Sequence, residues 1–263
     1  AGHAGHAGHG HEPWVAPSLI PDPRPLRPTP SGGRTRGCVA IIRVACGMIE
    51  EADHRMLRPH ALQPHPPRSF FRRDPVWVAR KLLGHRLVSG VGGTRTAGII
   101  VETEAYLGIA DKAAHTYEGR RSRRNRTMWG AAGHAYVYFV YGMHHCINVV
   151  AGETGDPVAV LIRALEPDAG IDTMFERRRR ARRATDLCSG PAKLCQALGI
   201  DLRLDGEDLT SSDLLCVESS NRRPPPTTIV ATPRVGIAYA EEWQNEPLRF
   251  FVAGNPHVSH GRG

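Results

Sequence analysis

One stretch, residues 136–150, constrains the fold more than any other, and it carries the letters YVYFVYGMHHCINVV. Its first half alternates like a β-strand, the pattern breaks at residues 141–144, and a second apolar run continues from Cys146 to Val150. Two strand-like runs joined by so few residues pair in antiparallel fashion. We therefore expect a β-hairpin with an aromatic strand and an exposed tip.

Three of the six tyrosines of the chain, Tyr136, Tyr138 and Tyr141, lie in this hairpin, although aromatic residues make up only 6% of the sequence. Aromatic residues on strands most often pack in the core of a sheet, and the pattern alone favours that role. The alternative is that the rings stack on a ligand. The hairpin by itself does not decide between the two.

Helical and strand-like segments follow one another in mixed order along the rest of the chain. Asp74 and Pro75 predict the start of a helix that ends at Gly84, and helices are also expected at residues 169–184 and 192–198. Further strands are expected at residues 86–91, 97–106, 158–164, 214–218, 229–231, 234–239 and 248–252. Because the strands do not alternate strictly with helices, the fold class is α+β, a single mixed domain with a mostly antiparallel sheet.

The first 67 residues differ from the rest of the chain. They contain half of the 14 histidines and 11 of the 21 prolines, and they begin with a repeated Ala-Gly-His unit. Such a segment cannot bury enough apolar surface to offset its chain entropy, so we expect residues 1–67 to be a disordered extension and residues 68–263 to form the domain. Metal binding by His3, His6, His9 and His11 is the alternative, and a flexible low-complexity tail is favoured over it.

The formal net charge of +8 suits an anionic partner such as nucleic acid. Only three of the 34 basic residues are lysines, a usage that a high-GC genome also produces, so part of the arginine excess carries no function. The six cysteines form no CxxC pair, which favours reduced thiols in a cytoplasmic protein. No run of 18 apolar residues occurs, so no membrane partner is expected.

Three segments could carry chemistry. In VETEAY, Glu102, Glu104 and Tyr106 share one face of a strand, which is either a solvated face, favoured on pattern alone, or a buried site for a carboxylate. The loop around residues 120–126 holds five arginines near aromatic residues and is equally a solvated loop or a phosphate contact. In SGPAK, Lys193 lies at a helix start, which is either a phosphate site formed by free backbone N–H groups or an ordinary helix entry.

Taken together, these residues resemble one family, the 3-methyladenine (alkyladenine) DNA glycosylases of the mammalian type, which also have bacterial members. The matching strings occur in family order across residues 70–259: VETEAYLG, AAH, RNRTM, YVYFVYGMHHCIN, VLIRALEP, LCSGPAKLCQALGI, RVGI and PLRFFVAGNPHVS. The resemblance implies a curved, open-barrel-like sheet with surrounding helices and a protruding β-hairpin. His144 and His145 depart from the pattern, because mammalian members carry an aromatic pair there.

The resemblance also implies roles for individual residues. Glu104 matches the base that activates a water, and Arg163 matches a residue that helps to hold that base and the water. Tyr106, His115, Tyr138 and Asn148 match the pocket for the extruded base, where Asn148 hinders the exocyclic amine of guanine. Four residues match DNA contacts, and Tyr141 among them is the wedge that enters the duplex; they are Tyr141, Met143, Arg126 and Lys193.

The activity expected from this resemblance is excision of damaged purines from double-stranded DNA by a monomer that needs no cofactor and no metal. The substrates would be 3-methyladenine and 7-methylguanine, with hypoxanthine and ethenoadenine as further candidates. Lysine is scarce, and only Lys193 lies in a matched motif, so we predict a monofunctional enzyme that leaves an abasic site. Two rival hypotheses are a glycoside hydrolase with Glu102 and Glu104 as its carboxylate pair and a nucleic-acid-binding module without catalysis.

Overall fold

A computed structural model of the chain describes residues 64–259. The histidine tract and most of the N-terminal extension that is predicted to be disordered therefore lie outside the described residues. Only residues 64–67 of that extension are described. These four lie before the first helix, and their backbone contacts the sheet: the carbonyl of Pro64 accepts a hydrogen bond from the Ser219 N–H at 2.9 Å. Among the described residues, no helix is long and apolar enough to cross a membrane.

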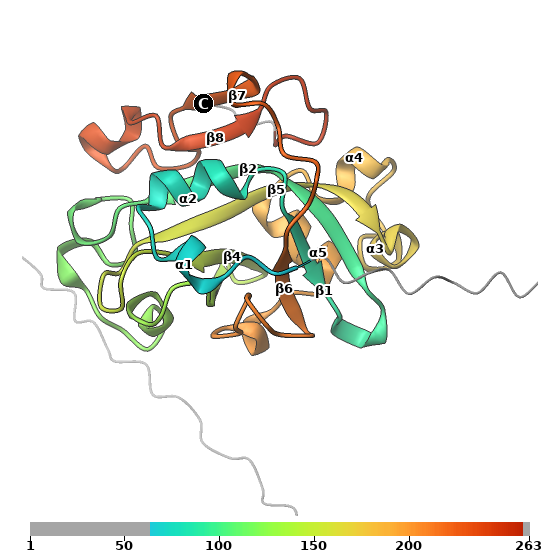
Figure 1. The fold of residues 1–263 in the computed structure, drawn as a ribbon, viewed down its shortest axis with the longest axis horizontal. Coiled ribbons are helices and arrows are strands. Elements are labelled where there is room, and N and C mark those ends of the chain that lie inside the picture. Colours follow the sequence, from blue (N-terminus) through green and yellow to red (C-terminus); the bar gives the residue numbers. More distant parts are fainter. Residues whose placement is uncertain (1–63, 260–263) are drawn as a thin grey trace, which may run out of the picture. The chain divides into compact units, whose positions relative to one another are not determined.

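The domain is built on one sheet of eight antiparallel strands, in the order β3-β4-β5-β2-β1-β6, with β8 paired to β2 and to β7 (Figure 1). The strands are β1 Arg86–Ser89, β2 Thr96–Tyr106, β3 Ala135–Val140, β4 His144–Val150, β5 Ala159–Ala169, β6 Leu215–Glu218, β7 Ile229–Thr232 and β8 Arg249–Val252. Five α-helices accompany them: α1 Arg68–Phe71, α2 Pro75–Leu82, α3 Ile171–Arg177, α4 Ala184–Leu187 and α5 Pro191–Leu198. The predicted α+β class with an antiparallel, unclosed sheet is confirmed.

The centre of the sheet is the long pair β2 and β5, and its register is interrupted twice in the middle. Ile100 lies opposite Leu165 while Glu102 lies opposite Ala164, so Val101 is an extra residue on β2. Thr103 then lies opposite Ile162, so Arg163 is an extra residue on β5. Such bulges bend a strand and redirect its side chains. At the same place β2 changes its other neighbour, from β1 to β8.

Three residues, 141–143, lie between Val140 and its cross-strand partner His144 at the tip of the β3–β4 hairpin. The first two, Tyr141 and Gly142, have positive φ (52° and 67°). The Met143 N–H donates to the Val140 carbonyl at 3.2 Å and closes the turn. Positive φ at both central positions defines a type I′ turn, whose twist matches that of paired strands. Tyr141 is 88% exposed as a result, so the predicted hairpin with an exposed tip is confirmed.

Helix α2 begins as predicted, because the Asp74 side chain accepts a hydrogen bond from the Trp77 N–H at 3.0 Å and Pro75 occupies the first helical position. It buries Val78, Ala79 and Leu82 against the sheet. On another side, α5 packs against β4 and β5. Both helices supply residues to the main hydrophobic core.

Two predicted elements are wrong. The single helix expected at residues 169–184 is two short helices, α3 and α4, because Arg178 donates to the carbonyls of Asp186 and Leu187 and pulls the chain into a turn between them. The strand expected at residues 234–239 is a loop. Its first residue, Arg234, donates to the carbonyl of Ala105 at 3.0 Å and holds the segment across the end of β2.

One buried histidine makes the stability of the fold depend on pH. His85 has no exposed surface, and its ring packs 5.1 Å from the ring of Phe70. Burial, and after it the positive charge of Arg223, lower the pKa of His85 from 6.5 to about 4. Its ring is therefore neutral in the folded protein at neutral pH.

We predict that this histidine makes the protein less stable as the pH falls from 6.5 towards 4. Above pH 6.5 the ring is neutral in both states, and between these values only the unfolded chain takes up the proton, so the free energy of unfolding decreases. His85→Gln should flatten that decrease by at most about 1.4 kcal/mol per pH unit in urea unfolding curves. His144→Gln, at an exposed position, is the control and should keep the wild-type slope. An unchanged slope for His85→Gln would contradict the prediction.

Candidate active site

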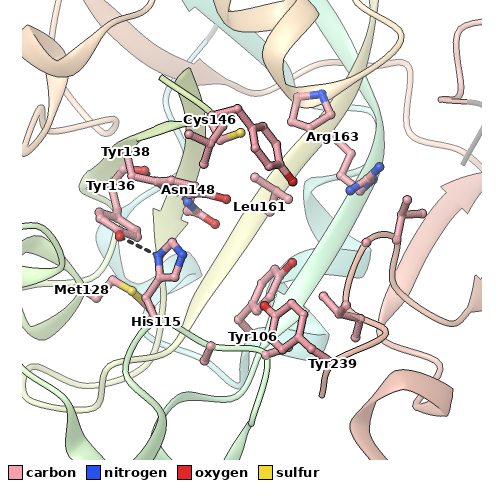
Figure 2. Close-up of a pocket in the computed structure, with 18 residues that line it drawn as sticks. Tyr106, His115, Met128, Tyr136, Tyr138, Cys146, Asn148, Leu161, Arg163 and Tyr239 are labelled. Atoms are coloured by element: carbon pink, nitrogen blue, oxygen red, sulfur yellow. Dashed lines mark hydrogen bonds between the residues drawn. The ribbon is translucent and has the colours of Figure 1, made fainter. Parts of the chain in front are cut away.

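A cavity of about 240 Å³ opens beside the hairpin, between strands β2 to β5 and the loop that follows β7 (Figure 2). Figure 2 places the Tyr136 and His115 pair on one side of it and Tyr106 with Tyr239 on another. Residues from seven separate parts of the chain line it: Tyr106, Ala113, Ala114, His115, Met128, Tyr136, Tyr138, Val140, Tyr141, Cys146, Asn148, Leu161, Arg163, Pro191, Val235, Gly236, Ile237 and Tyr239. Aromatic rings and a few convergent polar groups are typical of a small-molecule or base-binding pocket.

Glu104 lies directly behind the wall of this cavity and has no exposed surface. Its Oε1 accepts the Val235 N–H at 2.8 Å and lies 3.2 Å from a terminal nitrogen of Arg163. Among the described residues, its Oε2 accepts a hydrogen bond only from the Tyr106 hydroxyl, at 3.0 Å. All three donors line the cavity, so the carboxylate touches the cavity through them, and Oε2 keeps a lone pair for a further donor. The solvated strand face favoured by the sequence pattern is wrong.

Arg163, the extra residue of the β5 bulge, is only 7% exposed. Its Nε donates to Glu102 Oε1 at 3.0 Å, while its terminal nitrogen faces Glu104. Burial acts to lower the pKa of this guanidinium, but the carboxylates of Glu104 and Glu102 outweigh it and raise the pKa. Arg163 thus stays positively charged between two buried carboxylates.

The wall formed by Tyr106 rests on a second buried ion pair. The guanidinium of Arg234 lies 4.7 Å from the centre of the Tyr106 ring and binds Asp111 with two hydrogen bonds of 2.6 and 2.9 Å. The Asp111 carboxylate also accepts the N–H groups of Leu107 and Ala113. Because Arg234 directly precedes Val235, this pair also fixes the backbone N–H that binds Glu104.

The opposite wall is an aromatic cluster of Tyr136, Tyr138 and His115. The tyrosine rings stack with centres 5.4 Å apart, and the His115 ring meets Tyr138 edge-on at 4.7 Å. The Tyr136 hydroxyl is 2.8 Å from His115 Nδ1. Burial, and after it the charge of Arg124, lower the pKa of His115 to about 4, so its ring is neutral at neutral pH. Burial raises the pKa of Tyr136, which keeps the phenol proton available for this hydrogen bond.

Asn148 completes the cavity from β4, directly opposite Tyr136 in the hairpin register. It is 4% exposed, and its Nδ2 donates to the Tyr136 carbonyl at 3.3 Å. The orientation of the amide is therefore fixed by the hairpin that also positions Tyr136 and Tyr138.

The structure thus brings together Glu104, Arg163 and the four predicted pocket residues, but it leaves three predicted DNA contacts outside the cavity. Met143 is 69% exposed at the hairpin tip. Arg126 is exposed beside a separate hollow, next to Arg121, which stacks on Trp129 at 3.9 Å. Lys193 is exposed on α5 near Ser189. Tyr141 alone of the four lines the cavity rim.

Sequence reasoning missed several residues that build this site. Asp111 and Arg234 are 123 positions apart, and nothing in their local pattern indicates a buried pair. For Tyr136 the hairpin pattern favours core packing, and the structure shows that its hydroxyl also contacts His115. Tyr239, 69% exposed on the rim, lies in a segment predicted as a strand. Among the described residues, no group of three or more His, Cys, Asp or Glu side chains could hold a metal ion.

Comparison with known proteins decides the family. The model of the family Methylpurine-DNA glycosylase matches residues 69–256. The chain belongs to this family. The resemblance seen in the sequence is confirmed, and the protein is a DNA glycosylase, a hydrolase of N-glycosyl bonds that acts on alkylated bases in DNA repair.

Two bacterial relatives agree with this assignment. A protein of Desulfitobacterium hafniense is 47% identical over 199 residues, which cover 73% of this chain and 97% of the relative. A protein of Bacillus mycoides is 48% identical over 201 residues, covering 73% of this chain and 98% of the relative. Both carry the provisional name 3-methyladenine DNA glycosylase.

We predict that Asp111→Asn destabilises this glycosylase by about 3–5 kcal/mol in urea unfolding, because it leaves the buried Arg234 guanidinium without its counter-charge. Glu153→Gln is the matched control. Its ion pair with Arg72 is exposed on both sides, so its loss should change the free energy of unfolding by less than about 1 kcal/mol. Similar effects of the two substitutions would contradict the structural role of the buried pair.

Proposed function

We propose that this glycosylase extrudes a damaged purine from duplex DNA into the cavity beside the hairpin and hydrolyses its N-glycosidic bond with a water activated by Glu104. The observation that carries this proposal is the buried Glu104 carboxylate, held by three donors at the back of an aromatic cavity. A base inside a duplex is out of reach of such a group, so extrusion must come first.

Contacts inside the cavity would offset the free-energy cost of extruding the base from the duplex. Tyr106 and Tyr138 offer ring surfaces for stacking, at roughly 1–3 kcal/mol per contact. When the Tyr136 hydroxyl donates to His115 Nδ1, the neutral imidazole carries its proton on Nε2, and that N–H is free to donate to the edge of a purine. Damaged and mispaired bases are easier to extrude, which favours them over normal pairs.

Glu104 Oε2 is the proposed acceptor of the water proton, because its sister oxygen is already bound by Val235 and Arg163. The water oxygen then adds to C1′ of the deoxyribose as the bond to the purine nitrogen breaks and its electron pair leaves with the base. The carboxylate also stabilises the oxocarbenium-like charge at C1′.

The low pKa of His115 bears on lesion preference. 3-Methyladenine and 7-methylguanine already carry positive charge, so they leave as neutral bases without an acid. Hypoxanthine and ethenoadenine must gain a proton, and a histidine with a pKa of about 4 is a poor acid at neutral pH. We therefore propose cationic alkylated purines as the preferred substrates, with the neutral lesions as slower ones.

The proposed DNA contacts lie around the cavity mouth and beyond it. The type I′ turn presents Tyr141 without a partner ring among the described residues, as a wedge that would fill the space left by the base. Met143 would follow it into the duplex, and Arg126 and Lys193 would bind backbone phosphates as exposed cations. We propose that a monomer suffices, because one chain supplies every group of the cavity.

Two observations weigh against the rival activities. Only one donor to Glu102, Arg163, lines the cavity, whereas all three donors to Glu104 do. This difference argues against a glycoside hydrolase in which the two glutamates act as a pair. None of the described residues that line the cavity is a lysine, so a Schiff base has no amine there. The missing amine supports a monofunctional glycosylase that leaves an abasic site.

We predict that Glu104→Gln abolishes excision of 3-methyladenine and 7-methylguanine while the variant still binds the same DNA, because the amide cannot accept the water proton. The measurement is a single-turnover assay on a duplex with one lesion, with and without hot alkali. Wild-type enzyme should give strand breaks only after alkali, as expected when no lyase step follows.

Glu166→Gln is the matched control, because Glu166 is a partly exposed carboxylate on β5 with its own arginine partner, Arg222. It should cleave at the wild-type rate. Equal cleavage by Glu104→Gln and wild type, or breaks without alkali, would contradict the proposal.

We predict that Asn148→Ser increases excision of undamaged guanine, because the shorter side chain leaves room for the exocyclic amine that the fixed Asn148 amide excludes. Excision of 7-methylguanine by the same variant reports whether the cavity remains intact. Release of guanine and 7-methylguanine from duplex DNA, measured by chromatography, gives the ratio of the two rates. An unchanged ratio would contradict the exclusion role.

A further inference from the structure

The first glutamate of the VETEAY segment, Glu102, has a set of contacts that the proposed chemistry does not use. Its carboxylate is fully buried and accepts four hydrogen bonds. Two come from guanidinium Nε atoms, of Arg163 at 3.0 Å and Arg249 at 2.6 Å. Two come from Ser259, whose N–H and hydroxyl donate at 2.7 and 2.8 Å. A buried carboxylate with this many donors is held in one orientation.

These contacts belong to one buried cluster with balanced charge. Two carboxylates, Glu102 and Glu104, face two guanidiniums, Arg163 and Arg249, in the middle of the sheet. Only Arg163 contacts both carboxylates. Its Nε is taken by Glu102, and its terminal nitrogens reach Glu104 at 3.2 Å and the Ser259 hydroxyl at 3.4 Å.

We propose that Glu102, clamped by Ser259 and Arg249, is the positioning residue that aims the Arg163 guanidinium at Glu104. This inference rests on the proposed function, in which Glu104 is the base. A guanidinium is a rigid planar fork, so fixing Nε and one terminal nitrogen fixes the direction of the other. The two glutamates of β2 therefore have different roles: Glu104 acts at the cavity, and Glu102 acts through Arg163.

The bulges explain why Arg163 needs such a clamp. As the extra residue of β5, Arg163 has no cross-strand neighbour in the register of the sheet, so strand pairing does not fix its side chain. The fixed direction has to come from side-chain contacts, and Glu102 and Ser259 supply them. Ser259 lies in the segment after β8, so the C-terminal end of the domain takes part in the arrangement.

The test is a double-mutant cycle on the single-turnover excision rate, with Glu102→Gln, Arg163→Lys and the double variant. Each single substitution should lower the rate by roughly 10- to 100-fold, because a displacement of about 1 Å at a catalytic group has effects of this size. If Glu102 acts through Arg163, the double variant should be no slower than the slower single variant. The dissociation constant for lesion-containing DNA should stay within about two-fold of wild type.

Glu218→Gln is the matched control for loss of a buried carboxylate. Glu218 is 1% exposed and binds two arginines, Arg86 and Arg95, on β6, which lies two strands away from β2. It should lower the melting temperature as Glu102→Gln does but leave the excision rate unchanged. If the role of Glu102 were only structural, Glu102→Gln would lower the melting temperature and leave the excision rate unchanged, as is expected of Glu218→Gln.

A wild-type rate for Glu102→Gln, or independent rate losses that multiply in the double variant, would overturn the inference. If Glu102→Gln fails to fold, Ser259→Ala replaces it in the cycle, since it removes the hydroxyl contacts to Glu102 and Arg163 and keeps every charge. Its rate should fall by roughly 3- to 10-fold, the effect of losing the hydrogen bonds of one hydroxyl, and an unchanged rate would overturn the inference. Full activity of Glu104→Gln would instead refute the proposed function, whatever the Glu102 variants show.

Discussion

The buried ion cluster of Glu102, Glu104, Arg163 and Arg249 is the interaction on which the site depends. Each charge alone would be strongly disfavoured at this depth, and the cluster is tolerated because its charges balance and its hydrogen-bonding groups find partners. The cluster joins β2, β5 and β8, which are the strands that meet where the register is interrupted. Fold and proposed catalytic centre therefore depend on each other.

Around this cluster the protein combines rigid aromatic surfaces with neutral hydrogen-bonding groups. Tyr106 rests on the Arg234 and Asp111 pair, and Tyr136 fixes both His115 and Asn148. A neutral His115 suits recognition of a base edge better than proton donation. In the proposed mechanism, this division favours damaged bases that leave without help from an acid.

Much of the fold could be predicted from local patterns. The hairpin, α2 and most strands follow from alternation, a cap and a proline, because these signals act within a few residues. The helix expected at residues 169–184 and the strand expected at 234–239 failed for a common reason. In both, one arginine side chain, Arg178 or Arg234, binds distant carbonyl groups and redirects the backbone, and such contacts leave no trace in local periodicity.

The sequence by itself determined the family and the α+β class, because the motifs occur together and in order, and it predicted several residues that the structure places at the cavity, among them Tyr106, His115 and Tyr138. It could not decide whether Glu102 and Glu104 face solvent or the interior, since alternation gives a shared face but not its environment. The tertiary structure decided that question through two bulges and the approach of β8, which bury both carboxylates against arginines from other strands. Burial and charge pairing depend on residues 60 to 150 positions away, and only the folded chain brings them within hydrogen-bonding distance.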